Sequence, residues 1–273
     1  MRARLAIVAA ATLALAGCGS SGGGTSLASG SASPPPPTTD ATPMPSATPT
    51  PAPTAGGACA NAYFPVVAGA TWTYRSHVAQ TTAVVRQTLA AITASGFTSV
   101  SSSSQGSERD VWTCGAEGLA DVQQHVSGGG GAISFGGQTF QTGVQNFHHY
   151  RSRGVTLPSG LDVGSSWTQV VRSSSRFQLA GSSYPETQVV TTVSRVVGRG
   201  SVTTPAGTFD ALKVQTTATT RKAIPALGRH LTSVVHGTMW AVSGVGIVEA
   251  TSTNSSGFVT TRTLLAYRIP GAG

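Results

Sequence analysis

The sequence contains few of the residues on which most enzymes rely. Only 10% of its 273 residues are charged, 6% are aromatic and three are cysteines. Residues 58–273 hold no Gly-x-Ser-x-Gly elbow, and the chain has no HExxH metal motif and no Ser-x-x-Lys pair. The glycine-rich stretches 128–131 and 244–246 lack the context of a phosphate or dinucleotide loop. We therefore expect no catalytic residues, no metal and no cofactor.

Acidic residues are scarcer than basic ones. The chain has 9 Asp and Glu against 17 Lys and Arg, and the longest basic run is Arg221-Lys222. A scattered basic surface is more often solvated than functional, although weak attraction to anionic lipids or wall polymers stays open. No nucleic-acid-binding motif is present, so we expect no nucleic-acid partner.

Long apolar runs are missing except at the start of the chain. Arg2 and Arg4 precede the apolar segment 5–15, which is too short to span a bilayer. The segment ends in Leu-Ala-Gly before Cys18, which resembles the bacterial lipobox. This resemblance implies a signal peptide over 1–17 and a diacylated Cys18 that anchors the chain to a membrane. A plain secretory signal followed by a chance cysteine is the alternative. We expect a cell-envelope protein that faces outside the cytoplasm.

The segment after the lipobox is low in complexity. Residues 18–57 are rich in Gly and Ser and then in Pro and Thr, with Asp40 as the one charged residue. Such a composition cannot bury enough apolar surface to offset its ordering entropy. We predict a disordered tether with a span of roughly 35 Å as a flexible coil. Loss of Arg2 and Arg4 with the signal would leave 15 basic residues against 9 acidic ones, a net charge of +6.

Cysteine usage points to an oxidising compartment. With Cys18 used by the anchor, Cys59 and Cys114 remain as an even pair, and we predict that they form a disulfide. Metal binding by two cysteines so far apart, without neighbouring histidines, is the weaker interpretation.

Residues 58–273 read as a single β-rich domain. They are rich in Val, Thr, Ser, Ala and Gly, and no long stretch shows a 3.6-residue apolar period. Closely spaced turn signals indicate antiparallel hairpins. The predicted strands are 72–79, 82–94, 108–114, 118–126, 166–179, 187–197, 208–219, 231–242, 245–253 and 258–269. The predicted turns are 182–186, 203–207, 243–244 and 254–257, and short helices are candidates near 139–151 and 222–230.

Three tryptophans accompany permissive glycines at strand ends. The stretch from Phe64 and the stretch from Leu157 each continue with Pro and then Gly-x-x-Trp, so Trp72 and Trp167 begin strands in the same way. Trp240 stands near the Gly-Val-Gly of 244–246. Large aromatic side chains at such positions usually anchor a core. We predict that all three tryptophans are core anchors.

Three motifs carry a family resemblance. They are YFPVVAGATWTY at 63–74, VTTPAGTFDALKV at 202–214 and MWAVSGVGIVEA at 239–250. Together they resemble poorly characterised bacterial envelope lipoproteins that are distantly similar to the lipoprotein carriers LolA, LolB and LppX. The resemblance implies a curved antiparallel sheet, like half a barrel, with few short helices and an apolar hollow. The chain departs from the pattern by its Ser- and Gly-rich middle and its lack of an obvious lid helix.

Few residues are candidates for chemistry. His148 and His149 are adjacent, so they point to opposite faces of a strand, and His125 lacks a metal-ligand spacing to either. Asp110 and Asp121 are candidates for a pair across a hairpin, but we expect both to be solvated at the surface.

Three functions remain open. The first is a non-catalytic lipoprotein that binds or scaffolds an apolar ligand or a partner protein on its curved sheet. The second is a structural or surface-interaction protein, for example in wall or pilus assembly. The third is an envelope hydrolase with an unrecognised site. An apolar cavity would favour the first, a filled core the second, and a His–carboxylate–Ser contact in a cleft the third.

Overall fold

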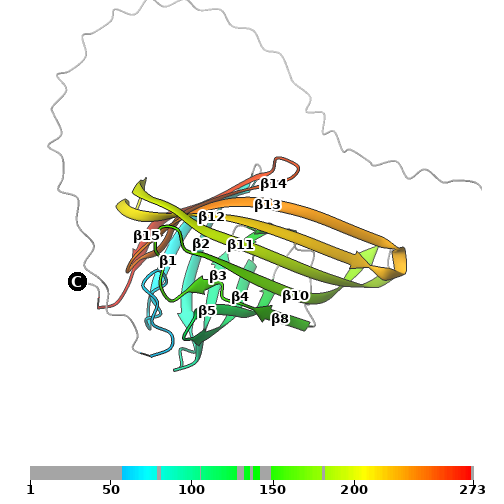
Figure 1. Ribbon diagram of the computed structural model, residues 1–273, viewed down its shortest axis with the longest axis horizontal. Coiled ribbons are helices and arrows are strands. Elements are labelled where there is room, and N and C mark those ends of the chain that lie inside the picture. Colours follow the sequence, from blue (N-terminus) through cyan, green and yellow to red (C-terminus); the bar gives the residue numbers. More distant parts are fainter. Residues whose placement is uncertain are drawn as a thin grey trace, which may run out of the picture. The chain divides into compact units, whose positions relative to one another are not determined.

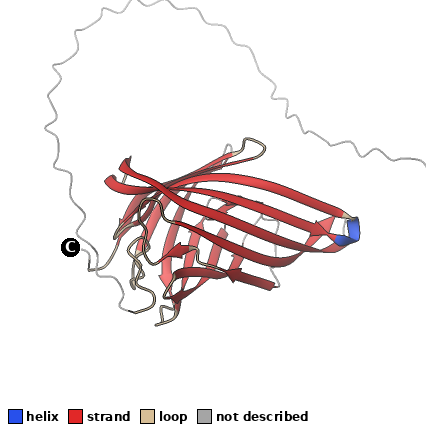
Figure 2. Cartoon of the chain, in the orientation of Figure 1, coloured by secondary structure: helices blue, strands red, loops and turns tan. Residues whose placement is uncertain are grey.

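The fold is one large antiparallel sheet that curls upon itself. The computed structural model describes residues 57–78, 81–104, 106–127, 132–135, 138–141, 149–179 and 182–271. These residues belong to one compact unit, Ser46–Gly273. Thirteen strands form the sheet, in the order β8-β10-β11-β12-β13-β14-β15-β1-β2-β3-β4-β5-β9, and β6 pairs with β7 separately. Figures 1 and 2 show the long strands of one half arching over the shorter strands of the other. The predicted fold class, mainly β with a curved antiparallel sheet, is confirmed.

The strands divide into a short-stranded and a long-stranded half. The first half contains β1 (Thr71–Val78), β2 (Thr81–Ala90), β3 (Gly96–Ser103), β4 (Gly106–Gly115), β5 (Gly118–Ser127) and β9 (Leu157–Pro158). The second half contains β8 (His149–Arg153), β10 (Ser166–Leu179), β11 (Ser182–Thr204), β12 (Gly207–Ile224), β13 (Arg229–Val242), β14 (Gly246–Asn254) and β15 (Val259–Arg268). The small sheet contains β6 (Ala132–Phe135) and β7 (Gln138–Gln141).

The hairpin of β11 and β12 shows why the sequence forms such long strands. β-branched residues alternate along both strands and pair from Thr187–Ala223 to Thr204–Gly207. The connecting turn contains a proline, whose φ suits a turn, and is followed by Gly207 at φ +136°. A side chain at that φ would be strained, so the predicted turn at 203–207 is specified by its glycine.

The two edges of the curled sheet meet at Thr156. Its backbone N–H donates to the carbonyl of Leu119 over 2.8 Å, and its Oγ1 accepts from the N–H of Asp121 over 2.9 Å, both on β5. From β10, Gln169 donates to Oγ1 of Thr156 over 2.8 Å and Trp167 donates to its carbonyl over 3.1 Å. Thr156 therefore links β5 to β10 through one backbone hydrogen bond and three hydrogen bonds that involve side chains.

Two hydrophobic clusters fill one end of the curled sheet. One contains Ala70, Trp72, Tyr74, Val202, Phe209, Ala211, Val242, Val245, Val248, Leu264 and Ile269. The other contains Cys59, Val66, Phe97, Trp112, Leu119, Leu157, Leu161, Val196, Leu212 and Val214. The rings of Phe209 and Tyr267 lie 6.1 Å apart, although β12 and β15 are not neighbours in the sheet. The sheet is therefore coiled tightly enough for distant strands to pack together.

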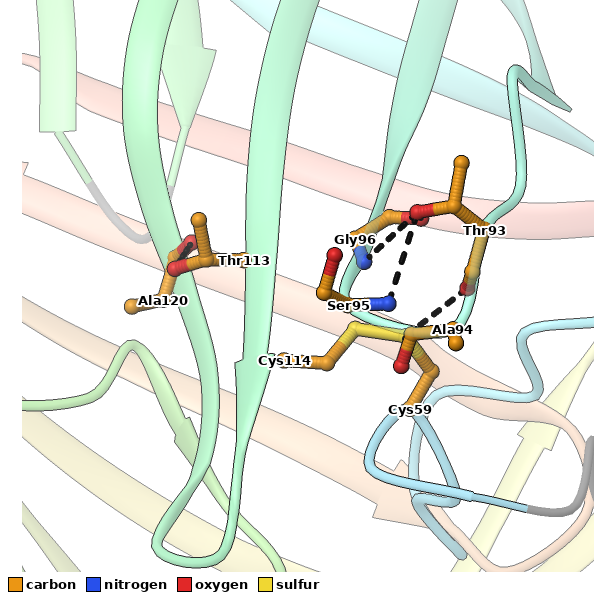
Figure 3. The surroundings of a disulfide bond; sticks show 8 residues. All are labelled: Cys59, Thr93, Ala94, Ser95, Gly96, Thr113, Cys114 and Ala120. Atoms are coloured by element: carbon orange, nitrogen blue, oxygen red, sulfur yellow. Dashed lines mark hydrogen bonds between the residues drawn. A yellow bond between two sulfur atoms is a disulfide. The ribbon is translucent and has the colours of Figure 1, made fainter.

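A disulfide fastens the segment before β1 to the short-stranded half. Cys59 and Cys114 are bonded, with their Cα atoms 4.8 Å apart, as predicted from the sequence. Figure 3 shows the bond beside the β2–β3 connection, where Thr93 Oγ1 accepts from the N–H of Gly96 over 3.1 Å. The N–H of Cys114 donates to the carbonyl of Ser95 over 2.9 Å. The disulfide thus links the N-terminal stretch to β4, and the hydrogen bond from Cys114 to Ser95 attaches the β2–β3 turn to the same place.

Some local predictions were wrong. The candidate helix near 222–230 is a single 3-10 turn at Pro225–Leu227, and the described parts of 139–151 are strands. The predicted turn at 182–186 belongs to β11, because these residues pair with β10 as far as Leu179–Ser182. Pro185 is tolerated there because β12 pairs with β11 only from Thr187 onward. Residues 96–103 form β3, which the serine-rich sequence concealed.

Candidate functional site

The inner face of β3 and β4 carries a buried polar network. Ser99 donates from Oγ to Oδ2 of Asp110 over 3.1 Å, and Trp112 donates from Nε1 to Oγ of Ser99 over 3.0 Å. Ser99 lies opposite Asp110 in the strand register, and Phe97 lies opposite Trp112. Since opposite residues point to the same face, the register of the hairpin assembles the network.

Three carboxylic acids gather on this face. Glu108, Asp110 and Asp121 are 5%, 0% and 3% exposed. Burial raises the pKa of Asp110 well above its usual range, and the neighbouring charges of Glu108 and Asp121 raise it further. The hydrogen bond from Ser99 and the charge of Arg262 oppose this shift without cancelling it. Burial therefore makes the protonated form of Asp110 more favourable than it is in water. Among the described residues, Oδ1 of Asp110 has no hydrogen-bond partner.

The expectation that Asp110 and Asp121 are solvated at the surface was wrong. Side chains of a strand alternate between faces, so Asp110 shares its face with Trp112 two residues later. The indole of Trp112 stacks on Phe97 at 5.6 Å in the core and holds that face inward. A bulge between Val111 and Trp112 then brings Asp121 opposite the tryptophan.

A cation reaches toward these acids from the centre of the sheet. The guanidinium of Arg262 on β15 lies 3.8 Å from the centre of the Tyr74 ring and donates from Nη2 to Oε1 of Gln87 over 3.0 Å. Burial raises the pKa of Tyr74, and the charge of Arg262 opposes that rise. The arginine is thus held by an aromatic face and an amide.

The long-stranded half also has a polar inner face. Lys222 on β12 forms an ion pair with Glu186 on β11, with 3.2 Å between Nζ and Oε1. The carboxylate side chain is 6% exposed and the lysine side chain 31% exposed. Other buried polar residues of β10–β12, β14 and β15 are Ser173, Ser175, Gln188, Ser194, Thr204, Thr216, Ser252 and Thr260. Hydroxyl, amide and charged groups therefore line this part of the sheet.

The network around Ser99 is closed to solvent. A catalytic serine needs a base that takes its proton and access to a substrate. Ser99 donates to the buried carboxyl group of Asp110, accepts from Trp112 and is itself 0% exposed. This geometry locks the register of β3 and β4.

The histidines singled out in the sequence are not brought into a described site. His148 lies outside the described residues, His149 begins β8, and His125 in β5 pairs with Arg109 in β4. Among the residues that the structure describes, no group of three His, Cys, Asp or Glu side chains is placed to hold a metal ion. Cys18, the predicted lipidation site, also lies outside the described residues.

The outer face carries an open pocket of about 340 Å³ across β12, β13 and β14. Hydroxyl and other polar groups dominate its lining, which consists of Gln215, Thr216, Thr217, His236, Gly237, Thr238, Thr251 and Thr253. Thr217 Oγ1 and His236 Nδ1 lie 3.3 Å apart within hydrogen-bonding reach. We call this the threonine pocket. Its donors and acceptors suit a polar contact.

The predicted tryptophan anchors are all packed against the core clusters. Trp72 is 1% exposed and donates from Nε1 to the carbonyl of Val245 over 2.7 Å. Trp167 and Trp240 are half-buried and pack against the two clusters. Trp112 was missed, together with its partner Ser99, although the alternation Glu-x-Asp-x-Trp at 108–112 was a signal that these side chains share a face.

Within the described part of the chain, no helix has the length and apolar character needed to cross a membrane.

Comparison with known proteins finds a family model and crystal structures that are similar to the chain. A family model described as DUF3108-like matches residues 146–265, which hold the strands from β8 to most of β15. No curated protein matches the chain. Two crystal structures are similar to it. One is a predicted lipoprotein from Parabacteroides distasonis, at 13% identity and a TM-score of 0.40, covering 77% of this chain and 99% of that one. The other is a predicted exported protein with a YmcC-like fold from Bacteroides fragilis, at 16% identity and a TM-score of 0.41, covering 76% and 99%.

Proposed function

We propose that the protein is a non-enzymatic lipoprotein of the bacterial cell envelope that acts through contacts made by the outer face of its curved sheet. The observation that carries this proposal is the burial of the inner face. Its charged and hydroxyl groups, from Asp110 to Glu186, are covered by the chain itself in the described residues. The surface of the domain that other molecules can contact is therefore the outer face of the sheet.

An apolar ligand fits the inner face poorly. Hydroxyl, amide and carboxyl groups that lose hydrogen-bonding partners to an apolar ligand cost free energy, on the order of 1–3 kcal/mol each in protein mutational data. The inner face has such groups on every strand from β10 to β12. Of the functions left open by the sequence, a scaffold or surface-interaction protein agrees best with this lining.

The burial of Asp110 supports the proposal that the domain is not catalytic. Asp110 has the strongly shifted pKa that often marks an active-site acid, but such a group needs a substrate within hydrogen-bond reach. Its carboxyl is fully buried, and its described hydrogen-bond partner is Ser99, which is equally buried. Support for the envelope location comes from the lipobox-like sequence that ends in Cys18.

The threonine pocket is the contact site that we assign to the outer face. Exposed Gln215 lies at its rim, beside Thr238 on the next strand. A photo-crosslinking amino acid at position 215, introduced in living cells, should give defined crosslinked products after irradiation.

The matched control places the same amino acid at Val84, which is 56% exposed on β2 and far from the pocket in the strand order. We expect few or no products there. Equal crosslinking at the two positions, or none at position 215, would contradict the assignment.

A further inference from the structure

Arginines form a row across the outer face of the long-stranded half. Arg151 on β8 lies opposite Arg172 on β10, Arg172 lies opposite Val189 on β11, and Val189 lies opposite Arg221 on β12. Directly opposite residues share a face, so the three arginines point the same way, across about 14 Å of sheet. Arg153 follows two residues after Arg151 on the same face. We call these four residues the arginine face.

All four side chains are available to a partner. Each of the four arginines is exposed, and in the part of the chain that the structure describes none of them forms an ion pair. These strands contain two acids. Glu186 is turned to the inner face, where it pairs with Lys222, and Asp210 lies near the start of β12, where it pairs with Arg199. The rows on either side hold Val170, Thr191, Thr219 and Val234, or Ser174, Thr187, Ala223 and His230, and no acid.

Repulsion between neighbouring arginines destabilises the folded sheet, and a bound anion would relieve that repulsion. Like charges directly opposite each other on neighbouring strands are destabilising, and Arg151 and Arg172 stand in that relationship. A guanidinium binds a phosphate with two parallel hydrogen bonds, which a lysine cannot do. A row of arginines without acids is thus complementary to a surface of closely spaced phosphates.

Two valines on this face, one half-buried and one exposed, favour a lipid surface over a soluble polymer. Val189 lies between Arg172 and Arg221, and Val193 on the same face of β11 is 49% exposed. A broad face that mixes arginine and valine matches the boundary between lipid headgroups and acyl chains, where charge and apolar area both contribute.

We propose that the arginine face docks on the anionic phospholipid headgroups of a membrane. This inference deepens the proposed function, because it rests on outer-face contacts and names the partner of one part of that face. Docking would lay β8, β10, β11 and β12 along the membrane. The threonine pocket, which begins at Gln215 beyond the arginine row, is tested separately by crosslinking, so either assignment can fail without the other.

The test is binding to vesicles by the chain from Gly19 onward, which lacks the predicted anchor but contains every described residue. Vesicles of phosphatidylcholine with 30% phosphatidylglycerol should bind it at low salt, and vesicles of pure phosphatidylcholine should not. A basic side chain near an anionic membrane contributes roughly fivefold in affinity, so Arg151→Gln, Arg172→Gln and Arg221→Gln together should weaken binding at least tenfold.

A matched control removes the same charge elsewhere. Arg75→Gln, Arg86→Gln and Arg109→Gln change three exposed arginines of β1, β2 and β4 and should leave vesicle binding within about twofold. Equal weakening by the two triple variants, or equal binding to vesicles without phosphatidylglycerol, would overturn the proposal. Binding to soluble polyphosphate without binding to vesicles would overturn it in favour of an anionic polymer. Circular dichroism and thermal melting should show that both variants are folded.

Discussion

Ser99 donates a hydrogen bond to Asp110 across the β3–β4 ladder, and neither side chain is exposed to solvent. A carboxyl group in such a place is costly as an anion, since burial and two neighbouring acids oppose its charge. The domain contains this group in its folded interior rather than in an accessible cleft. Ionisation of Asp110 should therefore change the free energy of unfolding of the protein with pH.

The stability of the domain should fall as pH rises above about 4 because of Asp110. Its pKa in the folded state is raised above the unfolded value, so the folded state holds the proton over a range where the unfolded state has released it. The stabilisation is complete below the unfolded pKa and is lost as pH rises through the folded pKa. Asp110→Asn should flatten this decline, measured by urea unfolding at several pH values from 4 to 8.

The matched control for Asp110 is Asp210→Asn. Asp210 is exposed and pairs with Arg199 over 3.1 Å. The Asp210 variant should keep the wild-type slope of the free energy of unfolding against pH. An Asp110→Asn protein with the wild-type slope would show that folding does not raise the pKa of Asp110.

Loss of the disulfide should destabilise the domain. The bond joins residues 55 apart, for which the chain-entropy model gives a contribution of about 4 kcal/mol. Cys59→Ala with Cys114→Ala should lower the midpoint of denaturant unfolding, whereas Cys18→Ala should leave it unchanged. Two alkylatable thiols in the denatured, unreduced wild-type domain would show that the bond is absent from the natural protein.

Trp72 should be the most sensitive of the predicted anchors. Its indole is 1% exposed and hydrogen-bonds to Val245, 173 residues away in the sequence. Trp72→Ala should cost about 3–5 kcal/mol and lower the folded yield. Trp240→Ala should cost less, since Trp240 is half-buried and stacks partly under Lys213, with 5.4 Å between Nζ and the ring centre. Equal losses in chemical denaturation would contradict this ranking.

Cys18 should decide whether the protein stays on the membrane. Cys18→Ala removes the thiol that the lipobox-like motif presents for acylation, and lipid chains contribute about 0.8 kcal/mol for each buried methylene group. The variant should leave the membrane fraction in high-salt washes and lose labelling by a clickable fatty acid. Full retention of the variant after such washes would contradict the predicted anchor.

The sequence predicted the fold better than the site. Most strand positions follow from alternating β-branched residues, and the turns at Gly207 and Gly244 follow from backbone conformations that glycine adopts readily. β3 was missed because serine is a poor strand indicator. The inward-facing Ser99 acquires its hydrogen-bonding role only when the strand register places Asp110 opposite it. Arg262 meets Tyr74 and Gln87 only through the closing of β15 onto β1, which no local pattern contains. The arginine face has the same origin, since Arg151, Arg172 and Arg221 become neighbours only through strand register.

Native mass spectrometry of the protein gently extracted from cell envelopes is the most direct test of the claim that the domain acts through its outer surface. A buried, polar inner face predicts that the domain carries no ligand inside. The measured mass should equal that of the mature polypeptide plus the lipid on Cys18, both before and after mild collisional activation. An additional apolar molecule at one copy per chain, retained after detergent removal, would show that the sheet encloses a ligand and would contradict the account.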